Sequence, residues 1–346
     1  MSSSITIFGA GSWGTALAVH LAAAGRDVTL WARRPEAIEQ MRRTRFNPRY
    51  LPDLRIPESV QLTSDLEVAA SASSLWAVAV PSHSLRSVAE RLRPHTDELD
   101  IIVSLAKGIE NDTLMTMSQV LRDVLDAVPE ERIGVLYGPS HAEEVAEGRP
   151  TTVVASAPDE GIAERIQDLF MTTGLRVYVN TDVTGVEIGG SAKNVLAIAA
   201  GISDGVGYGD NAKAAIITRG LAEIRRLGIA MGAQPQTFGG LAGIGDLVVT
   251  CMSPHSRNRH LGEQIGQGKT LDEVLDEMDM VAEGVRTTQS IHDLARHYDL
   301  EMPITEAVYA VLFEDERPRE MVMELMTRSA KRENWLPDAL QETVSG

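Results

Sequence analysis

The chain has 346 residues, enough for two domains, and its 43% hydrophobic and 23% charged residues are typical of a globular protein that folds in water. Its net charge of −17 argues against non-specific binding to nucleic acid or to anionic membranes. No apolar run approaches the roughly 18 residues that a membrane-spanning helix needs. The N-terminus lacks the basic segment of a signal peptide, and the lone Cys251 has no partner for an internal disulfide. We therefore expect a cytoplasmic protein.

Lysine is scarce, with five lysines against 27 arginines. A GC-rich genome and adaptation to salt both explain this bias, and the sequence leaves both open. The scarcity draws attention to each lysine, because an acidic protein that binds anions must gather positive charge locally.

Eight short apolar segments alternate with amphipathic ones over the first 180 residues. This pattern predicts a mainly parallel sheet with helices on both faces, an α/β doubly wound domain. The expected strands are 5–9, 27–31, 60–63, 75–80, 100–105, 133–137, 151–155 and 176–180.

The first expected strand leads into a G-x-G-x-x-G loop, Gly9-Ala10-Gly11-Ser12-Trp13-Gly14, and then into the helical "GTALAVHLAAAG". This context is the one in which such a loop binds a dinucleotide pyrophosphate. Gly9 allows a tight turn, Gly11 lets the backbone approach the phosphates, and Gly14 lets helix and strand pack closely. The alternative is a glycine turn without a ligand.

Two arginines, Arg33 and Arg34, follow the second expected strand. An NAD-specific site carries an acidic residue near this point, which binds the ribose 2′-hydroxyl and repels a 2′-phosphate. Arginine instead binds a 2′-phosphate with paired hydrogen bonds. We therefore expect NADPH or NADH as the cofactor, with the two arginines favouring acceptance of NADPH, and the sequence leaves the preference between the two open. Two solvated arginines at a helix start remain the alternative.

Lys107 follows the fifth expected strand, in "SLAKGIEN". Ligands of open parallel sheets lie outside the carboxyl ends of the strands, where this lysine can face a bound anion. An ordinary surface lysine is the alternative.

After Asp182, a candidate helix N-cap, helical periodicity replaces strand signals. We expect an NAD(P)-binding domain over 1–182, a helical domain over 183–335 that contains the substrate site, and a tail over 336–346. Met321, Met323 and Met326 are expected to fill the core of the helical domain.

Lys193 lies in "GVEIGGSAKNVLAIAAG", on a helical face of small and apolar residues. Its ammonium must either reach the surface or face a polar cavity, because burial without a partner is costly. In a cavity, desolvation and a second cation such as Lys107 lower the pKa of this amine, and Lys193 can then exchange a proton near neutral pH.

A third candidate stretch is "GLAGIGDLVVTCMSPHSRNRHLG". Its glycines indicate close packing around Asp246, which is either a helix cap or part of a site. Ser256 is a candidate N-cap, so that the helix start and Arg257 can hold a phosphate, although an exposed salt bridge is the alternative for Arg257. No metal-ligand spacing, nucleophile elbow or Walker loop is visible.

These stretches together resemble the bacterial-type NAD(P)-dependent glycerol-3-phosphate dehydrogenases. The resemblance covers nearly the whole chain, from "GAGSWGTALA" through "AKGIE", "GPSHAEE", "SAKNVLAIAAGISDGVGYGDNAKAAIITRGLAE" and "GLAGIGDLVVTC" to "SRNRHLG" and "VAEGVRT". It implies an N-terminal Rossmann-like domain and an all-helical C-terminal domain like that of 6-phosphogluconate dehydrogenase.

The resemblance also implies roles for individual residues. Lys193 is expected to be the catalytic proton acceptor in the oxidative direction. The expected substrate-binding residues are Lys107, Gly138, Ser140, Lys193, Asp246, Ser256, Arg257 and Asn258. The expected cofactor-binding residues are Gly9, Gly11, Ser12, Trp13, Gly14, Arg33, Arg34, Tyr50, Lys107, Ala142, Arg257, Val281 and Glu283.

The implied reaction is reversible hydride transfer between NAD(P)H and dihydroxyacetone phosphate, which gives sn-glycerol 3-phosphate for phospholipid synthesis. The resemblance further implies a homodimer, and neither it nor the sequence calls for a metal. Two alternatives stay open at this stage. One is a dehydrogenase of the same architecture that acts on a hydroxy acid or a ketopantoate-like substrate, and the other is a non-catalytic NADPH sensor.

Overall fold

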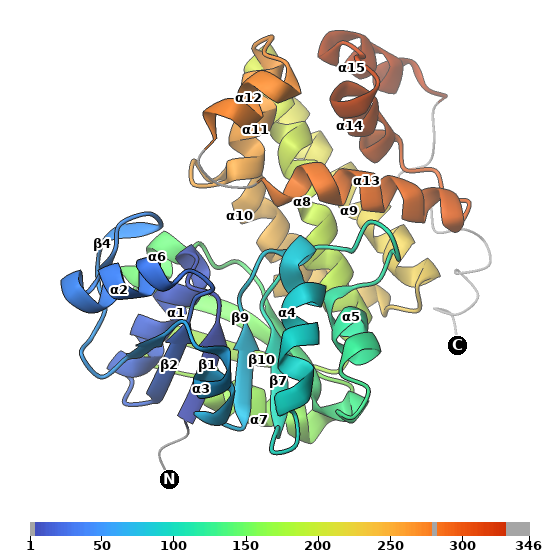
Figure 1. Cartoon of the computed structure of the whole chain (residues 1–346). Coiled ribbons are helices and arrows are strands. Elements are labelled where there is room, and N and C mark those ends of the chain that lie inside the picture. The colour runs from blue at the N-terminus through green and yellow to red at the C-terminus, as the bar shows by residue number, and fades with distance from the viewer. Residues whose placement is uncertain (1–3, 279–281, 330–346) are drawn as a thin grey trace.

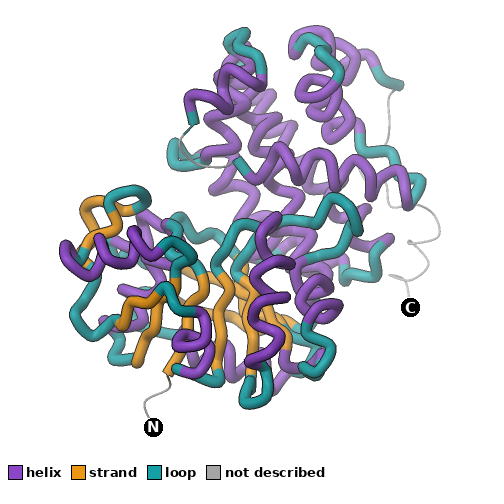
Figure 2. Tube along the Cα trace, in the orientation of Figure 1, coloured by secondary structure: helices purple, strands orange, loops and turns teal. Residues whose placement is uncertain are grey.

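The computed structural model describes residues 4–278 and 282–329, and it divides into a lower part built on a sheet and an upper part built of helices (Figures 1 and 2). All eight expected strands form one sheet, which confirms the α/β prediction. Its strands are β1 (Ser4–Phe8), β2 (Asp27–Trp31), β5 (Gln61–Thr63), β6 (Leu75–Val78), β7 (Ile101–Ser104), β8 (Ile133–Tyr137), β9 (Thr151–Ser156) and β10 (Leu175–Asn180).

The sheet has the order β10-β9-β8-β7-β6-β1-β2-β5. Every pairing is parallel except that of β8 with β9. From β5 to β8 this is the doubly wound order of Rossmann-like domains. The order reverses between β1 and β6, so a crevice for a ligand is expected outside the carboxyl ends of these two strands.

The alternation of side chains along the strands explains why helices cover both faces. Ile5 and Ile7 of β1 point to one face and pack with one set of helices, whereas Phe8 points to the other face and packs with a second set. The first set is α1 (Ser12–Ala23), α2 (Pro35–Thr44) and α7 (Glu160–Phe170). The second set is α3 (Leu66–Ser71), α4 (Leu85–Leu92) and α5 (Met117–Val124).

A small hairpin of β3 (Phe46–Asn47) and β4 (Leu51–Arg55) was not expected from the sequence. β3 has only two residues, and β4, with the sequence LPDLR, carries no apolar run. Tertiary contacts hold the hairpin instead. The Asn47 amide donates to the carbonyl of Ala10 at 3.0 Å and to the Thr15 hydroxyl at 2.8 Å, which fixes the hairpin beside the glycine loop.

The upper part surrounds one long helix, α8 (Val183–Val206), which is buried along nearly its whole length. Most of its residues are apolar or small on all sides, as expected of a helix in the middle of a core, and the exceptions include the buried Glu187 and Lys193. The other helices are α9 (Asp210–Ala230), α10 (Asp246–Met252), α11 (Arg257–Gly266), α12 (Leu271–Glu277), α13 (Glu283–His297), α14 (Pro303–Phe313) and α15 (Pro318–Thr327).

Asp182 is the N-cap of α8, as predicted, and its carboxylate accepts from the Gly185 N–H at 2.9 Å. The change from strands to helices therefore falls between Asn180 and Val183. Domain limits at 182 and 335 stay our prediction, and the expected tail over 336–346 lies outside the described residues.

The prediction that three methionines fill the core is wrong. Met323 and Met326 are 60% and 77% exposed, and α15 buries none of its residues. Hydrophobic spacing alone misled the prediction, because α15 is the last described helix and packs at the edge of the helical part, beside α14 (Figure 1).

Two carboxylates of the helical part bind serines of the sheet part. Glu187 of α8 accepts from the Ser118 N–H at 2.8 Å and from the Ser118 hydroxyl. Glu283, the first residue of α13, accepts in the same way from the N–H and hydroxyl of Ser82. These four hydrogen bonds fix the two parts against each other.

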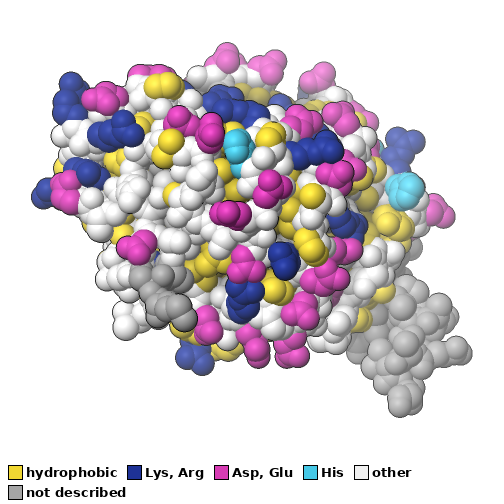
Figure 3. Space-filling view, turned by 60° about the horizontal axis from the view of Figure 1, so that its bottom comes forward, with side chains coloured by type: hydrophobic (Ala, Val, Ile, Leu, Met, Phe, Trp, Pro, Cys, Tyr) yellow, Lys and Arg dark blue, Asp and Glu magenta, His cyan; other side chains and the backbone are white. Residues whose placement is uncertain are grey.

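Acidic side chains are spread over the face shown in Figure 3, interspersed with lysines and arginines, as the net charge requires. Within the described residues, no helix has both the length and the apolarity to cross a membrane.

Candidate active site

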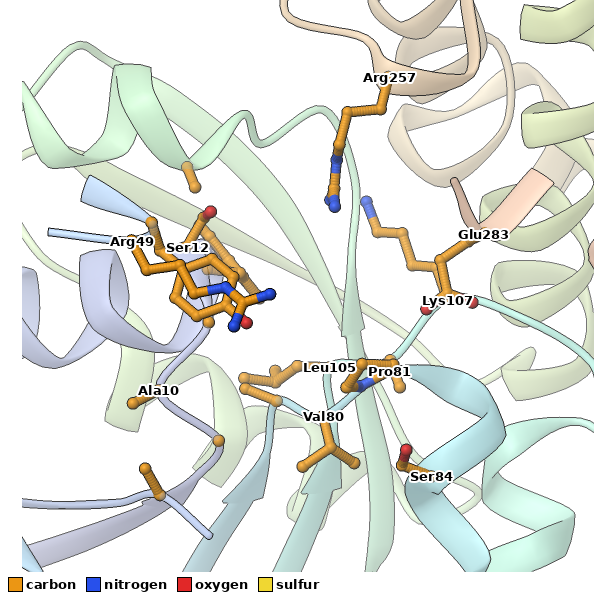
Figure 4. Close-up of a pocket in the computed structure, with 18 of the residues that line it drawn as sticks. Ala10, Ser12, Arg49, Val80, Pro81, Ser84, Leu105, Lys107, Arg257 and Glu283 are labelled. Atoms are coloured by element: carbon orange, nitrogen blue, oxygen red, sulfur yellow. The ribbon is translucent and has the colours of Figure 1, made fainter. Parts of the chain in front are cut away.

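A cavity of about 690 Å³ lies between the carboxyl ends of the strands and the helical part. Both parts contribute to its walls (Figure 4). Fifteen of the predicted site residues line it: Gly9, Gly11, Ser12, Trp13, Arg33, Arg34, Tyr50, Lys107, Ser140, Ala142, Lys193, Ser256, Arg257, Asn258 and Glu283.

Three other predicted residues, Gly14, Gly138 and Asp246, lie directly behind the cavity wall and contact residues that line it. Val281 lies outside the described residues. The structure thus brings together residues that are more than 270 positions apart in the sequence.

The surroundings of the three loop glycines fit the roles expected of them. Gly9 has φ +123°, and a Cβ there would lie 2.5 Å from the Ala79 carbonyl oxygen. A Cβ on Gly14 would lie within contact distance of both the Ala79 side chain and the Gly9 backbone, so this glycine allows α1 to approach β1. A Cβ on Gly11 would meet no described atom within 4 Å, so the space beside this glycine is open toward the cavity.

The start of α1 faces the same space. No side chain caps this helix at Gly11, and its first turn begins with Ser12 at the cavity wall. Uncapped N–H groups at the positive end of a helix suit a phosphate. The open place at Gly11 and the uncapped helix start together fit a dinucleotide pyrophosphate.

The centre of the cavity wall contains a buried charge cluster. Asp246, at the start of α10, is 1% exposed and lies between two lysines. One carboxylate oxygen accepts from Lys107 Nζ at 2.8 Å, and the other accepts from Lys193 Nζ. Lys193 is 6% exposed, so its amine faces the cavity region and does not reach bulk solvent.

Further hydrogen bonds fix the orientation of both ammonium groups. Lys107 Nζ also donates to the Gly138 carbonyl at 2.8 Å, and Lys193 Nζ donates to the Thr250 hydroxyl at 2.8 Å. The Thr250 hydroxyl in turn donates to the Asp246 backbone carbonyl, one helical turn earlier, at 2.6 Å. Its single proton is thereby committed, and its oxygen is left to accept from Lys193.

Burial lowers the pKa of Lys193 to about 8. The negative charge of Asp246 opposes this shift, and the positive charge of Lys107 adds to it. Burial alone would raise the pKa of Asp246, but the charges of Lys107 and Lys193 outweigh burial and hold that pKa below its ordinary value. Two ammonium groups and one carboxylate leave a net positive charge at the wall, which attracts an anion.

The glycine pair before Lys193 serves packing. A Cβ on Gly189 would lie 2.6 Å from the Ala242 carbonyl oxygen, and one on Gly190 would lie 2.5 Å from the Tyr137 ring. Both glycines therefore let neighbouring chain approach α8. This close approach places Lys193 between the two parts of the molecule.

The start of α11 forms another part of the helical wall, across the cavity from the start of α1. Ser256 is its N-cap, as predicted, and the hydroxyl accepts from the Arg259 N–H at 3.2 Å. Arg257 extends from this helix start toward Lys107, across the cavity from Ser12 and Arg49 (Figure 4). Asn258 is anchored because its side-chain oxygen accepts from the Gly284 N–H at 2.9 Å.

Sequence reasoning missed several lining residues, namely Arg49, Arg91, His141, Asn194, Thr250 and His255. One signal was available for Thr250, because a residue four positions after Asp246 on a helix shares its face. Arg49 belongs to the unexpected hairpin, and Arg91 lies on a helix surface with no motif around it. Within the described residues, no group of three or more His, Cys, Asp or Glu side chains could hold a metal. That no metal takes part stays a prediction.

Comparison with known proteins gives the family. The model for the NAD-dependent glycerol-3-phosphate dehydrogenase N-terminus matches residues 4–163, and that for the C-terminus matches residues 182–323. A relative from Salinibacter ruber, "Glycerol-3-phosphate dehydrogenase [NAD(P)+] 2", is 76% identical over 99% of both chains. A glycerol-3-phosphate dehydrogenase [NAD(P)+] from Chlorobium phaeobacteroides is 54% identical over 95% of this chain and 98% of its own.

The crystal structure of glycerol-3-phosphate dehydrogenase from Coxiella burnetii has a TM-score of 0.90 and 39% identity, over 94% of this chain and 99% of that one. A ketopantoate reductase from Ralstonia eutropha shares only the fold, with a TM-score of 0.56 and 17% identity over 92% of this chain and 99% of its own. The chain belongs to the NAD(P)-dependent glycerol-3-phosphate dehydrogenase family.

Proposed function

We propose that this chain catalyses the reversible reduction of dihydroxyacetone phosphate to sn-glycerol 3-phosphate with NAD(P)H. The observation that carries the proposal is the Lys107–Asp246–Lys193 cluster at the wall of a cavity that the glycine loop also lines. Family membership supports the same reaction, because the relatives bear the name of this activity.

Lys193 is the proposed proton donor in the direction of reduction. When bound, NAD(P)H would supply the hydride to the carbonyl carbon of the substrate, which leaves negative charge on the former carbonyl oxygen. The Lys193 ammonium stabilises this charge and gives up a proton, and in oxidation the neutral amine takes the proton back. Asp246 and Thr250 orient the amine, because both hydrogen bond to it.

Lys107 and the start of α11 hold the rest of the substrate in this proposal. The Lys107 ammonium adds positive potential beside the reacting oxygen, while Ser256, Arg257 and Asn258 bind the phosphate group. A phosphate held away from the reacting carbon gives binding energy that positions the carbon without changing its chemistry. Gly138 and Ser140 complete the substrate site.

The cofactor in this proposal is NADPH in preference to NADH. Gly11 and Ser12 would hold its pyrophosphate, and Arg33 and Arg34 would bind its 2′-phosphate. Both arginines line the cavity, just after β2. A homodimeric assembly and a cytoplasmic location stay predictions.

Initial rates test the reaction. The purified protein is mixed with NADPH and either dihydroxyacetone phosphate or ketopantoate, and the absorbance of NADPH is followed. We expect turnover with dihydroxyacetone phosphate alone, because the cationic helix start matches a phosphate. Turnover of ketopantoate alone would contradict the proposed substrate, and turnover of neither would contradict the proposed enzyme class.

A further inference from the structure

One face of α4 lines the cavity, although no loop motif marks this helix. The lining residues Ser84, Ser87, Val88 and Arg91 recur at intervals of three and four along the chain, which places them on one side of the helix. Arg91 is the last of them. It therefore lies on the side of the helix that faces the cavity, near the end of α4.

Arg91 is placed beside the end of β2 by an aromatic contact. The guanidinium carbon lies over the ring of Trp31, 5.5 Å from its centroid. The ring is itself fixed, since its N–H donates to the Ser64 carbonyl at 3.1 Å and Trp31 is 2% exposed. Trp31 is the last residue of β2 and precedes Arg33 by two positions. The cation thus lies in the neighbourhood of Arg33 and Arg34.

The charge environment of Arg91 differs from that of neighbouring arginines. On the same helix, Arg86 pairs with Glu110 at 2.9 Å and with Asp123 at 2.6 Å. Just beyond the helix, Arg93 pairs with Asp126 at 3.2 Å. Over residues 4–278 and 282–329, no carboxylate forms an ion pair with Arg91.

The lack of an ion pair at Arg91 within the described residues is unusual, because the chain has 49 acidic residues against 32 lysines and arginines. A guanidinium held over an aromatic ring by a cation–π contact still has its N–H groups for hydrogen bonds to an anion. Edge N–H groups of arginine match the oxygens of a phosphate in pairs. Arg91 therefore has the place and the chemistry to bind an anion at this end of the cavity.

We propose that Arg91 is a third arginine, with Arg33 and Arg34, that binds the 2′-phosphate of NADP(H). This assignment rests on the proposed cofactor preference and deepens it. Arg91 comes from the opposite side of the crevice to the β2 loop, so the three cations surround the phosphate. The arrangement also explains why Arg91 lines the cavity without an acidic partner.

Calorimetric measurement of the binding of two nucleotides separates the contact between Arg91 and the 2′-phosphate from contacts to the rest of the nucleotide. Adenosine 2′,5′-bisphosphate carries the 2′-phosphate, and adenosine 5′-monophosphate lacks it. We expect Arg91→Ala to weaken binding of the bisphosphate by about tenfold or more, the scale of one charge-assisted hydrogen bond. Binding of the monophosphate should hardly change. Arg91→Lys keeps the charge without the planar fork and should give an intermediate loss.

Arg93→Ala is the matched control. Arg93 lies two positions further along, is paired with Asp126 and does not line the cavity, so its removal should leave both affinities unchanged. The thermal unfolding temperature of each unliganded variant shows whether the fold is kept. If Arg91→Ala does not fold, Arg91→Lys and Arg91→Gln provide the comparison.

Equal weakening of both nucleotides by Arg91→Ala would overturn the proposal, because the arginine would then bind the adenosine itself. No effect on either nucleotide would overturn it as well. Wild-type protein that binds the two equally would refute the preference for NADPH together with the role of Arg91. Failure to reduce dihydroxyacetone phosphate, with the calorimetric pattern intact, would refute the proposed reaction and leave the role of Arg91 standing.

Discussion

The two walls of the cavity recognise their ligands in different ways. On the sheet side, a six-residue loop offers backbone N–H groups and the space left by a missing side chain at Gly11. On the helical side, recognition depends on the charged side chains of Lys193 and Asp246, and Asp246 also pairs with Lys107 from the loop after β7, 139 positions away in the sequence. A contiguous loop can be recognised from its local pattern, whereas a charge cluster exists only after the chain has folded.

The two walls also differ in how deeply their residues are buried. The glycine loop is partly open to the cavity, while Asp246 and Lys193 are nearly inaccessible. Removing charged groups from water is costly, and only close opposite charges and hydrogen bonds offset the cost. The same burial lowers the pKa of Lys193 to about 8, closer to neutrality than the pKa of an exposed lysine.

Lys193→Ala tests the helical wall with the largest expected effect. Loss of the proton donor should lower kcat for dihydroxyacetone phosphate reduction by about 10²- to 10⁴-fold. NADPH affinity, measured by fluorescence, should be retained, because the sheet wall is unchanged. Lys269→Ala is the control, since Lys269 pairs with Glu277 at the surface. A variant that lacks Lys193 and still turns over near the wild-type rate contradicts the assigned role.

Gly11→Ala and Gly14→Ala sharpen the contrast within the sheet wall. A Cβ on Gly11 meets no described atom but occupies the place of the pyrophosphate, so we expect KM for NADPH to rise about tenfold with the melting temperature unchanged. A Cβ on Gly14 collides with the Gly9 backbone, which should lower the free energy of unfolding by roughly 1–3 kcal/mol. If Gly11→Ala binds NADPH as tightly as wild type, the cofactor does not approach this loop.

A second buried carboxylate, Glu223, shows how strongly the two lysines change the pKa of Asp246. Glu223 of α9 is 4% exposed and accepts from the N–H groups of Ile304 and Thr305 at the start of α14. No lysine lies at hydrogen-bond distance from it within the described chain. Burial raises the pKa of Glu223 to about 7, whereas the two lysines hold the pKa of Asp246 below its ordinary value.

Glu223→Gln measures this difference. The pKa of Glu223 is higher in the folded protein than its value of 4.5 in the unfolded chain. Protonation of Glu223 therefore stabilises the fold fully below pH 4.5, and this stabilisation is lost as the pH rises through 7. The free energy of unfolding of wild type relative to Glu223→Gln should therefore fall between pH 4.5 and pH 7, by at most about 3 kcal/mol. Urea unfolding at a series of pH values measures the trend. A difference that does not change with pH contradicts it.

The sequence predicted what local patterns determine. All eight main strands were expected because apolar runs alternate with helices, and the caps at Asp182 and Ser256 follow from side chains that accept N–H groups. The hairpin at Phe46–Arg55 was missed because Asn47 holds it through contacts with distant residues. The methionines of α15 were misplaced because spacing does not show whether a neighbour covers a helix face.

The site was predictable residue by residue but not as an arrangement. Lys193 was singled out because an ammonium on an apolar face needs a partner, yet nothing in the sequence showed that Asp246 bridges it to Lys107. Likewise, Arg91 became a candidate only when Trp31 placed it beside the end of β2.

The pH dependence of kcat/KM in both directions tests the central claim most directly. Because kcat/KM reports the free enzyme, reduction of dihydroxyacetone phosphate should need the Lys193 ammonium and decline above pH of about 8. Oxidation of sn-glycerol 3-phosphate should need the neutral amine and increase with pH up to the same value. Opposite slopes that meet at one pKa near 8 are the predicted result. Two profiles that change in the same direction, or a reductive profile that stays flat to pH 10, would contradict Lys193 as the group that exchanges the proton.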